Sequence, residues 1–277
     1  MNASLEAMHR LEEAGFEVYQ VGGAVRDRLA NLGEPEDVDL ATNANLEDMV
    51  RVLEAVPVSS RAKVPTAVFK GVEVTSFRSE KGSRAELLFE PATLEEDAFR
   101  RDFTVNSLYM DSSGKVLDPT GKGLVHLFFK ELHFIGDPAE RLREDPTRVL
   151  RAYRLSAKLG FRLADATLEA LRDSVSLLDN LAAEQVGKEL RKLLVVPDGA
   201  RVARAFEQMA VDGVLAKILP EVDALRGVMQ NSHHREGDVF THTMMVLERT
   251  SPNLVLRMAA LLHDVGKPLT QKEKEGK

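Results

Sequence analysis

The chain has 277 residues, about two domains by the usual size of a domain, and its 44% hydrophobic and 29% charged residues suffice for packed cores, which excludes disorder as the main state. Its net charge of −7 would repel nucleic acid if it were spread evenly, so RNA binding would require a local basic patch. The absence of cysteine excludes disulfide bonds, thiolate zinc sites and cysteine nucleophiles, and leaves metal binding to His, Asp and Glu.

The first residues read MNASLEAMHRLEEAG, with acidic charge early, which is not typical of a signal peptide. No apolar run in the chain approaches the roughly 18 residues that cross a bilayer. We therefore expect a cytoplasmic protein that has no membrane partner.

Residues 16 to about 120 mix short β-branched or apolar runs with helical patterns, which predicts an α+β fold with a mixed sheet. Strands are predicted at residues 16–21, 72–77 and 104–110, and a helix is predicted at 24–30. Asn45 can cap a further helix. Apolar residues at the i, i+3, i+4, i+7 spacing form the buried stripe of that helix: Leu46, Met49, Val50 and Leu53.

From about residue 137 onward, helical stripes follow one another, which predicts an all-helical second half. The stripes are Leu168, Leu171, Val175 and Leu178; Val186, Leu190, Leu193 and Leu194; and Val202, Phe206 and Met209. Proline and glycine residues separate them at spacings that suit short connections.

The most informative stretch is Gly22-Gly23, thirteen further residues, and then the sequence DVDL from Asp37. If Val38 and Leu40 point into the core from a strand, Asp37 and Asp39 project from its other face, because side chains two apart share a face. Two neighbouring carboxylates repel each other unless a cation neutralises them. Such oxygen ligands suit Mg²⁺ that is bound together with substrate phosphates.

The two glycines fit the same chemistry. Gly22 and Gly23 let backbone N–H groups approach a triphosphate at the start of helix 24–30, with Arg26 as a fork for phosphate oxygens. The alternative is that the glycines only form a tight strand-to-helix turn and that the acidic residues only form an exposed loop. Because a phosphate-binding turn and a pair of carboxylates complement each other chemically, we favour the functional interpretation. Glu73 is either a third carboxylate near the metal or a paired acid on the strand surface, and the sequence leaves both open.

A basic stripe lies on the helix that begins near Pro146. Its cations are Arg148, Arg151, Arg154 and Lys158, opposite the apolar residues Val149, Leu150, Tyr153 and Ala157. Asp145 before Pro146 suits an N-cap, yet Arg148 stands where a capping box has Glu or Gln, which favours a second role for Asp145.

Asp145 and Arg148 together present an acceptor beside donors. This polarity complements the amino group and the ring nitrogen on the pairing edges of cytosine and adenine. Uracil and guanine present the opposite polarity there, so a pairing site of this kind selects C and A by leaving the wrong base unmatched.

These motifs resemble those of a known family. The Gly-Gly, spacer, Asp-x-Asp arrangement is similar to the catalytic motif of the DNA polymerase beta-like nucleotidyltransferases. The words VGGAVRDRL and EDVDLAT resemble the bacterial class II tRNA nucleotidyltransferase and poly(A) polymerase family, and VEVTSFR, RRDFTVNSL, LDPTG and REDPTRVLRAYRLSAKLGF follow in the order of that family. The resemblance covers nearly the whole chain.

The resemblance implies a polymerase beta-like palm followed by an all-helical neck and body. The implied divisions are a catalytic head at residues 1–124, a neck that binds nucleotide and RNA at 125–196, and a body at 197–277. It also implies that two Mg²⁺ held by Asp37 and Asp39 support transfer of a nucleoside monophosphate from CTP or ATP to a tRNA 3′-hydroxyl, with release of pyrophosphate.

The resemblance carries further site residues. Arg101 corresponds to a position that contacts the nucleotide, although a salt bridge beside Asp102 is an equal alternative. The protein template of the family corresponds to Glu144, Asp145 and Arg148, and phosphate or base contacts correspond to Arg151 and Arg154.

The nucleotide that is added depends on residues 79–93, SEKGSRAELLFEPAT. This stretch is shorter than the flexible loop of CCA-adding and A-adding members and lacks its Asp-x-Arg-Arg-Pro-like core, which resembles the CC-adding branch. Neutral loop variation is the alternative. We expect addition of CC, or of the complete CCA, with an A-adding enzyme or a poly(A) polymerase as the alternative.

His234, His242 and the pair His263-Asp264 lie in words that resemble an HD phosphohydrolase domain. Such residues can bind one metal, but the further downstream Asp of an HD centre is missing before Lys277, so we expect an incomplete site. Two other classes of function remain: an HD-type phosphohydrolase with an RNA-docking front half, and a catalytically silent RNA-binding protein. Neither gives Asp37 and Asp39 a role.

Overall fold

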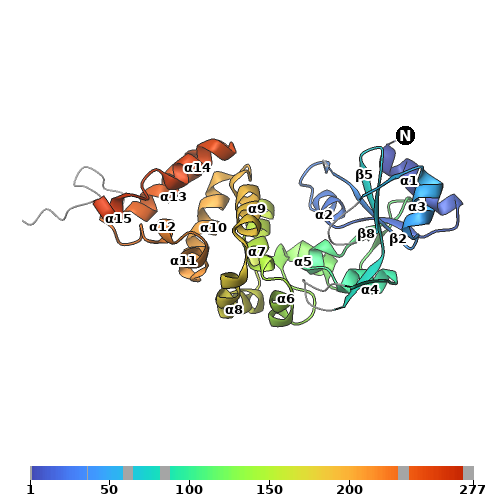
Figure 1. Cartoon of the computed structure of the whole chain (residues 1–277), viewed down its shortest axis with the longest axis horizontal. Helices are drawn as coiled ribbons and strands as arrows, with labels where there is room; N and C mark the ends of the chain where they lie inside the picture. Colours follow the sequence, from blue (N-terminus) through green and yellow to red (C-terminus); the bar gives the residue numbers. More distant parts are fainter. Residues whose placement is uncertain (1, 36, 59–64, 82–87, 230–236, 271–277) are drawn as a thin grey trace, which may run out of the picture. The chain divides into compact units, whose positions relative to one another are not determined.

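The structure is a computed structural model that describes residues 2–35, 37–58, 65–81, 88–229 and 237–270. It divides into two compact units, Met1–Glu144 and Asp145–Lys277. The first contains a mixed sheet with helices and the second is helical, so the predicted α+β fold is confirmed (Figure 1). The predicted division at 1–124, 125–196 and 197–277 stays a prediction. Among the described residues, no helix has the length and apolar character needed to cross a membrane.

The first unit contains both helices and strands. Its helices are α1 (Ala3–Glu13), α2 (Gly23–Leu29), α3 (Leu46–Leu53), α4 (Leu94–Phe99), the 3₁₀ helix η1 (Thr104–Asn106), α5 (Gly123–Phe129) and α6 (Pro138–Glu144). Its strands are β1 (Val18–Val21), β2 (Asp39–Thr42), β3 (Val56–Pro57), β4 (Thr66–Phe69), β5 (Val72–Ser76), β6 (Arg78–Lys81), β7 (Leu88–Pro91), β8 (Tyr109–Met110), β9 (Val116–Leu117) and β10 (Glu131–Leu132).

Seven strands form one sheet in the order β3-β4-β5-β2-β1-β8-β9. Strands β2 and β5 pair in parallel, and the other neighbours pair antiparallel. Strand β1 therefore lies between β2 and β8 in the interior of the sheet, where Val21 at the end of β1 meets Asp39 at the start of β2 and Tyr109 at the start of β8. Strands β6 and β7 form a separate antiparallel pair, and residues 82–87 of the stretch that resembles a shortened loop lie outside the described residues.

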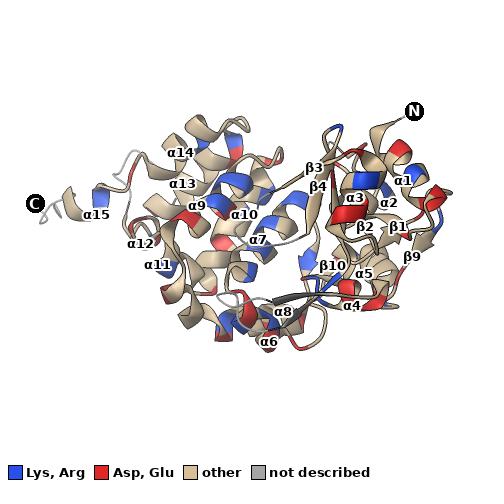
Figure 2. Cartoon of the chain, turned by 45° about the vertical axis from the view of Figure 1, so that its right-hand side comes forward, with Lys and Arg blue, Asp and Glu red and all other residues tan. Residues whose placement is uncertain are grey.

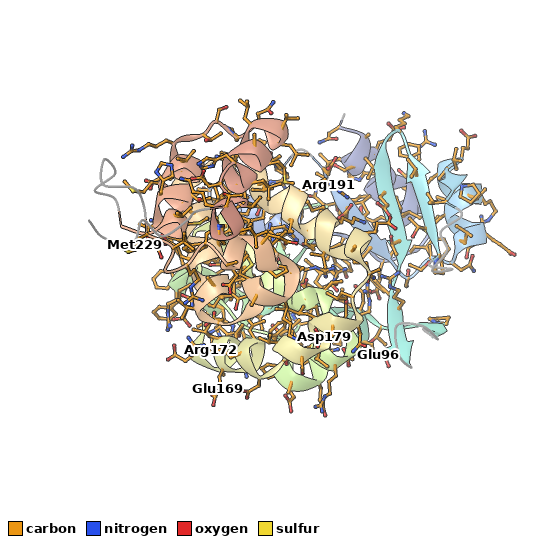
Figure 3. The ribbon with its side chains drawn as sticks, turned by 60° about the vertical axis from the view of Figure 1, so that its left-hand side comes forward. Glu96, Glu169, Arg172, Asp179, Arg191 and Met229 are labelled. Carbon is orange, nitrogen blue, oxygen red and sulfur yellow. The ribbon has the colours of Figure 1, made fainter. Side chains whose placement is uncertain are left out.

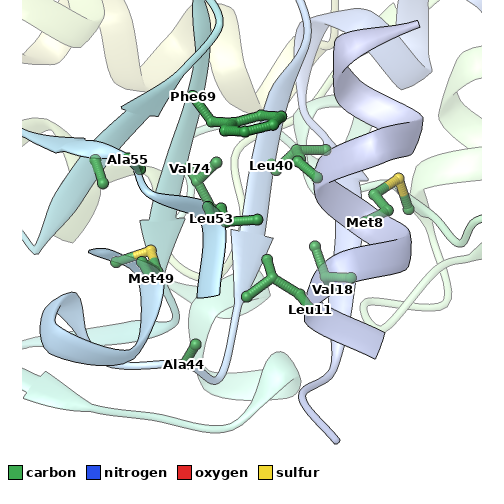
Figure 4. Packing of buried hydrophobic residues seen from close by; sticks show 12 residues of the cluster. Met8, Leu11, Val18, Leu40, Ala44, Met49, Leu53, Ala55, Phe69 and Val74 are labelled. Carbon is green, nitrogen blue, oxygen red and sulfur yellow. The ribbon is translucent and has the colours of Figure 1, made fainter. Parts of the chain in front are cut away.

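Each face of the sheet is covered by its own apolar cluster. On one face, α1 and α3 pack against Leu40 of β2 and Val74 of β5 through residues such as Met8 and Leu53, all at most 1% exposed (Figure 4). On the other face, α4 packs against the cluster that contains Ala41. Because Leu40 and Ala41 are consecutive, they enter opposite faces, as the alternation of a strand requires.

Two local predictions have different outcomes. The cap of α3 is confirmed, since the Asn45 side chain accepts a hydrogen bond from the backbone N–H of Asp48 at 2.9 Å. In the predicted stripe, Met49 and Leu53 are buried and Leu46 packs against the same cluster, while Val50 is only half-buried. The strand predicted at 104–110 is wrong over its first half, which forms η1. The Ser107 hydroxyl donates to the backbone oxygen of Thr104 at 3.0 Å, a local bond that competes with strand pairing.

The second unit contains helices of varied length. They are α7 (Thr147–Leu159), α8 (Asp165–Asp173), η2 (Val175–Asn180), α9 (Ala183–Leu194), α10 (Gly199–Val211), α11 (Val214–Ile218), α12 (Pro220–Asp223), α13 (Val239–Arg249), α14 (Leu254–Leu262) and α15 (Lys267–Thr270). The short strand β11 (Arg162–Leu163) departs from the all-helical prediction. The stripe predicted from Leu168 to Leu178 is broken at Ser174, where α8 ends and η2 begins.

Buried polar groups join the helices of this unit. The Asp212 carboxylate accepts from the Tyr153 hydroxyl of α7 at 2.9 Å and from Nε of Arg172 of α8 at 2.7 Å. Figure 3 labels Arg172 on α8. Arg257 of α14 is 1% exposed and donates to the backbone oxygens of Leu194, at 2.8 Å, and of Val196, at the end of α9. These bonds satisfy carbonyl groups that a helix end leaves without partners.

Candidate active site

Four side chains form a row across four strands of the sheet. Val21 of β1 lies opposite Asp39 of β2 and opposite Tyr109 of β8. The parallel register that pairs Leu40 with Val74 aligns Asp39 with Glu73 of β5. Because residues in register point to the same face, the row brings Glu73, Asp39, Val21 and Tyr109 to the face that α4 covers.

The alternation that sequence predicts around the acidic motif is present. Val38 and Leu40 pack in the cluster under α1 and α3, so Asp39 points to the opposite face. Asp37 precedes β2 and is exposed. Whether Asp37 and Asp39 are catalytic stays a prediction at this point.

Two carboxyl groups at this end of the sheet have raised pKa values. The pKa of Asp39 is raised because the surrounding protein removes water; the positive charge of Arg101 opposes this rise, and the negative charge of Asp37 adds to it. The pKa of Glu73 is raised by burial and then by the charge of Asp39. A group of carboxylates that disfavours its own ionised state has the electrostatics of a cation site. Glu73, which the sequence left open, therefore lies beside Asp39.

Gly22 makes the turn that follows the row. It is the N-cap of α2 with φ 71° and ψ −128°, a conformation that favours glycine. A Cβ built at Gly22 would lie 3.5 Å from Nη1 of Arg101, so the guanidinium closely approaches this turn. The Gly22 N–H donates to the backbone oxygen of Leu108 at 3.2 Å, and a Cβ at Gly23 would lie 3.5 Å from Nη2 of Arg26. Phosphate binding by Gly22 and Gly23 stays a prediction.

The sequence suggests that the guanidinium of Arg26 is open to phosphate oxygens, but in the structure this group is buried and bonded to other side chains. It is 3% exposed, and its Nε donates to Oδ1 of Asp27 at 2.7 Å. Its Nη1 donates to Oδ1 of Asn106, which joins α2 to η1. These contacts hold the turn in place, and a phosphate contact by Arg26 stays a prediction.

Arg101 is held by two buried groups. Its Nη2 donates to Oδ2 of Asp97 at 2.8 Å, and its Nε donates to the hydroxyl of Tyr109 at 3.0 Å. Asp97 also accepts from Nε of Arg100 at 2.8 Å. Burial raises the pKa of Asp97, but the charges of Arg101 and Arg100 outweigh it and lower that pKa to about 2. The alternative partner from the sequence, Asp102, accepts from Nδ2 of Asn106 at 2.8 Å.

In the second unit, Asp145 lies at the start of α7. Its Oδ1 accepts from the backbone N–H of Thr147 at 3.0 Å, while Pro146 is the N-cap. The sequence offered Asp145 as the N-cap with Pro146 as the first helical residue. In the structure the helix begins at Thr147, so Pro146 is the N-cap and Asp145 is the residue before it. Arg148 is 6% exposed, Arg151 and Arg154 are half-buried, and Lys158 is exposed, so the predicted basic stripe is only partly open to solvent.

Cations gather where α7 packs beside α9. Nε of Arg154 donates to Oε2 of Glu189 at 2.6 Å, while Arg151 of α7 is half-buried. Burial lowers the pKa of Lys192; Glu189 opposes this, and the charges of Arg154, Lys188 and Arg151 lower it further. Blue segments on α7 and α9 in Figure 2 mark this local basic patch, which the acidic chain needs for contact with an anionic partner.

Ligand atoms of the metal-binding type come together in the last helices, whereas those of Asp37, Asp39 and Glu73 do not all lie within 4.8 Å of one another. Among the residues that the structure describes, the only group of three or more whose ligand atoms all lie within 4.8 Å is His242, His263 and Asp264. The ring centroids of His242 and His263 are 5.5 Å apart, and Nζ of Lys267 lies 2.6 Å from Oδ2 of Asp264. His234 lies outside the described residues.

Comparison with known proteins agrees with this arrangement. Residues 18–132 match the family model described as "Poly A polymerase head domain", and residues 160–226 match "Probable RNA and SrmB- binding site of polymerase A". The multifunctional CCA protein of Halorhodospira halophila is 38% identical over 274 residues, which cover 93% of this chain and 64% of that protein. The chain belongs to the class II tRNA nucleotidyltransferase and poly(A) polymerase family.

Two further comparisons show the extent of the similarity. The CCA-adding enzyme of Geobacillus stearothermophilus is 35% identical over 80% of this chain and 56% of that protein. The crystal structure of the Bacillus stearothermophilus CCA-adding enzyme in complex with CTP has a TM-score of 0.70 and 34% identity, and the match covers 81% of this chain and 56% of that one. The chain spans 64% of the length of the multifunctional CCA proteins that it matches.

Sequence reasoning missed Asp97 and Tyr109. Asp97 lies among other acids in the run LEED, and Tyr109 lies at the end of an apolar run, so neither stands out by residue type. The available signal was the position of Asp97 four residues before Arg101, a spacing that brings two side chains together on a helix.

The buried Asp97 carboxylate predicts acid-dependent stability. Its pKa falls from 3.8 to about 2 on folding, so its contribution is complete above the unfolded value and is lost as pH falls through the folded value. We expect Asp97→Asn to reduce the free energy of unfolding at pH 7 by at least about 2 kcal/mol. In urea titrations, this difference from wild type should shrink between about pH 4 and about pH 2.

Glu95→Gln is the matched control, because Glu95 is an exposed acid on the same helix. A difference between wild type and Asp97→Asn that stays constant over this pH range would contradict the assignment of the low pKa to Asp97.

Proposed function

We propose that this chain is a template-independent tRNA nucleotidyltransferase. In this proposal it adds C residues, CC or the complete CCA, to tRNA 3′ ends from CTP and ATP, and it releases pyrophosphate. The observation that carries the proposal is the row that aligns Asp39 with Glu73 beside the Gly22 turn and Arg101. Relatives named CCA-adding enzyme and a related structure solved with CTP support the same chemistry.

The carboxylates fit a divalent cation by their chemistry. Asp37, Asp39 and Glu73 offer hard oxygen donors. After burial, the charge of Asp37 raises the pKa of Asp39 and the charge of Asp39 raises the pKa of Glu73, and a bound cation would relieve this repulsion. We propose that this cation is Mg²⁺ and that Asp37 and Asp39 hold it. If two Mg²⁺ ions bind, Glu73 would be a further ligand. When bound, the metal would favour ionisation of the RNA 3′-hydroxyl and neutralise charge on the departing pyrophosphate.

The protein groups around the carboxylates would bind and orient the triphosphate. Arg101 supplies a cation next to the turn, and the positive φ of Gly22 lets the chain reverse closely there. Asp39 and Arg101 lie near enough for the charge of one to shift the pKa of the other, so a phosphate between them would meet both cation and guanidinium. Positioning and electrostatic stabilisation account for most of phosphoryl-transfer catalysis.

We further propose that Asp145 and Arg148 read the base and that Arg151 and Arg154 contact base or phosphate. Asp145 accepts from the backbone of Thr147, which fixes its carboxylate at the start of α7. Glu189 holds Arg154 by a short ion pair and would set the direction of its guanidinium. The basic patch of α7 and α9 would meet the tRNA backbone, and its affinity would fall with salt.

Nucleotide addition gives the first test. The protein is incubated with Mg²⁺, tRNA that lacks its 3′ end, and each labelled nucleoside triphosphate separately. We expect incorporation of C, with A added only if the enzyme completes CCA. Asp39→Asn should lower the rate at least about a thousandfold, because it removes an anionic ligand from the site that stabilises the transition state.

Glu47→Gln is the control for this test, since Glu47 is an exposed acid in the first turn of α3. Incorporation at the wild-type rate by Asp39→Asn would refute the proposal. Incorporation of A alone, or of a long A tract, would instead identify an A-adding enzyme or a poly(A) polymerase.

Base choice gives a second test. We expect Asp145→Ala to lower the preference for CTP over UTP about tenfold or more, because the carboxylate that is proposed to reject uracil is removed. Its metal affinity should change less than its base preference. Asp165→Ala, at the exposed start of α8, is the control. Unchanged discrimination in a competition assay with both nucleotides would disprove base reading by Asp145.

A second candidate function rests on His242, His263 and Asp264. Nδ1 of His263 lies 2.7 Å from the backbone oxygen of Ala260, which fixes the orientation of the ring. Nε2 lies 3.1 Å from Oδ2 of Asp264, so a nitrogen and a carboxylate oxygen of the kind that bind metals lie together beside His242. This geometry favours metal binding of the HD phosphohydrolase type.

Calorimetric titration with Mn²⁺ in the absence of nucleotide tests this candidate. We expect His263→Ala to weaken one binding event about tenfold or more. His9→Ala, which removes an exposed histidine, should not. If His263→Ala gives the same titration as the wild type, the metal site is excluded. Lys267 already neutralises part of the Asp264 charge, so Lys267→Met should strengthen binding.

A further inference from the structure

We propose that Asp97 and Tyr109 are positioning residues that hold the Arg101 guanidinium at the Gly22 turn, where it would meet the triphosphate of the incoming nucleotide. This inference deepens the proposed function and rests on it. Neither Asp97 nor Tyr109 would touch the nucleotide. Both would act through Arg101.

The contacts of Arg101 define one orientation of its guanidinium. Nε is fixed by the Tyr109 hydroxyl at 3.0 Å and Nη2 by the Asp97 carboxylate at 2.8 Å. The guanidinium carbon also lies 5.2 Å from the centroid of the Tyr109 ring. With two nitrogens fixed, the plane of the group is set, and Nη1 is the nitrogen that approaches the backbone of Gly22.

The two anchoring groups are themselves fixed. Asp97 is 1% exposed and Tyr109 is 0% exposed. The Tyr109 hydroxyl donates to Oδ2 of Asp97 at 2.6 Å while it accepts from Arg101, and Arg100 binds Oδ1 of Asp97. The ring of Tyr109 is placed by its register opposite Val21. This buried network gives Arg101 few alternative rotamers.

The network also solves an electrostatic problem. Arg101 lies close enough to Asp39 for its charge to oppose the rise in the pKa of that carboxyl group. A flexible arginine would be attracted onto Asp39, Asp37 or Glu73 and would compete with the cation that these groups are proposed to bind. Asp97 gives the guanidinium a stronger, desolvated partner, which keeps it available to phosphate.

The test compares two tyrosines that pack in one cluster. Tyr109→Phe removes the hydroxyl that accepts from Arg101 and keeps the ring. Tyr19→Phe is the matched control, because the ring of Tyr19 lies 6.2 Å from that of Tyr109 and its hydroxyl does not bond Arg101 or Asp97. Each variant is made in the full chain, and its dissociation constant for CTP is measured by equilibrium dialysis with labelled CTP.

We expect Tyr109→Phe to weaken CTP binding about fivefold to tenfold, which is less than the usual effect of one hydrogen bond to a charged group because Asp97 still holds Arg101, and to raise the KM for CTP more than it lowers kcat. Tyr19→Phe should change either value less than twofold. In an Arg101→Ala background, Tyr109→Phe should have no further effect, because the group that it positions is gone.

The outcomes separate this inference from the proposed function. If the wild type binds CTP and Tyr109→Phe binds it as well as Tyr19→Phe does, the positioning role is wrong and the proposed function is unaffected. A loss that is equally large with and without Arg101 would also overturn it, since it would show a general structural effect. Wild-type protein that neither binds CTP nor incorporates nucleotide would overturn the proposed function and this inference together. Asp97→Asn, if it folds, should exceed Tyr109→Phe in its effect.

Discussion

Strand β1 pairs with β2 on one side and with β8 on the other, so that Val21 lies opposite both Asp39 and Tyr109. This double register is the constraint on which the candidate active site depends. A slip of one residue in either pairing would turn Asp39 or Tyr109 to the opposite face. The apolar cluster under α1 and α3 prevents such a slip at β2, because it would expose Leu40 and bury Asp39. Packing on one face of the sheet therefore fixes chemistry on the other.

A second constraint is the buried charge of Asp97. An isolated carboxylate at 1% exposure would be costly, and its pairing with Arg100, Arg101 and Tyr109 offsets that cost. Removal of one partner would leave the others poorly matched. The same network joins α4 to β8, so stability and the orientation of Arg101 are linked through a single buried acid.

The sequence was sufficient for much of this site, and particular residues show why. Alternation of Val38 and Leu40 predicted the face of Asp39 because a strand has a fixed period of two, and the stripe and cap of α3 were predictable for similar local reasons.

Tertiary features were not predictable. Arg26 was interpreted as an open fork, but its bonds to Asp27 and Asn106 depend on where η1 lies in space. The register that aligns Glu73 with Asp39 joins strands that are distant in sequence, and so does the bond from Tyr109 to Asp97. The start of α7 also lies one residue later than the sequence indicated, so that Pro146 and not Asp145 is the N-cap.

The central claim is that carboxylates on the row beside Gly22 bind a divalent cation together with the triphosphate of a nucleotide. Its most direct measurement is the affinity for Mn²⁺ in the presence of CTP, followed by electron paramagnetic resonance, for wild type, Asp39→Asn and Glu47→Gln. The account predicts that Asp39→Asn weakens nucleotide-dependent Mn²⁺ binding at least about tenfold, while Glu47→Gln binds as the wild type does. Equal affinity in Asp39→Asn and wild type would contradict it.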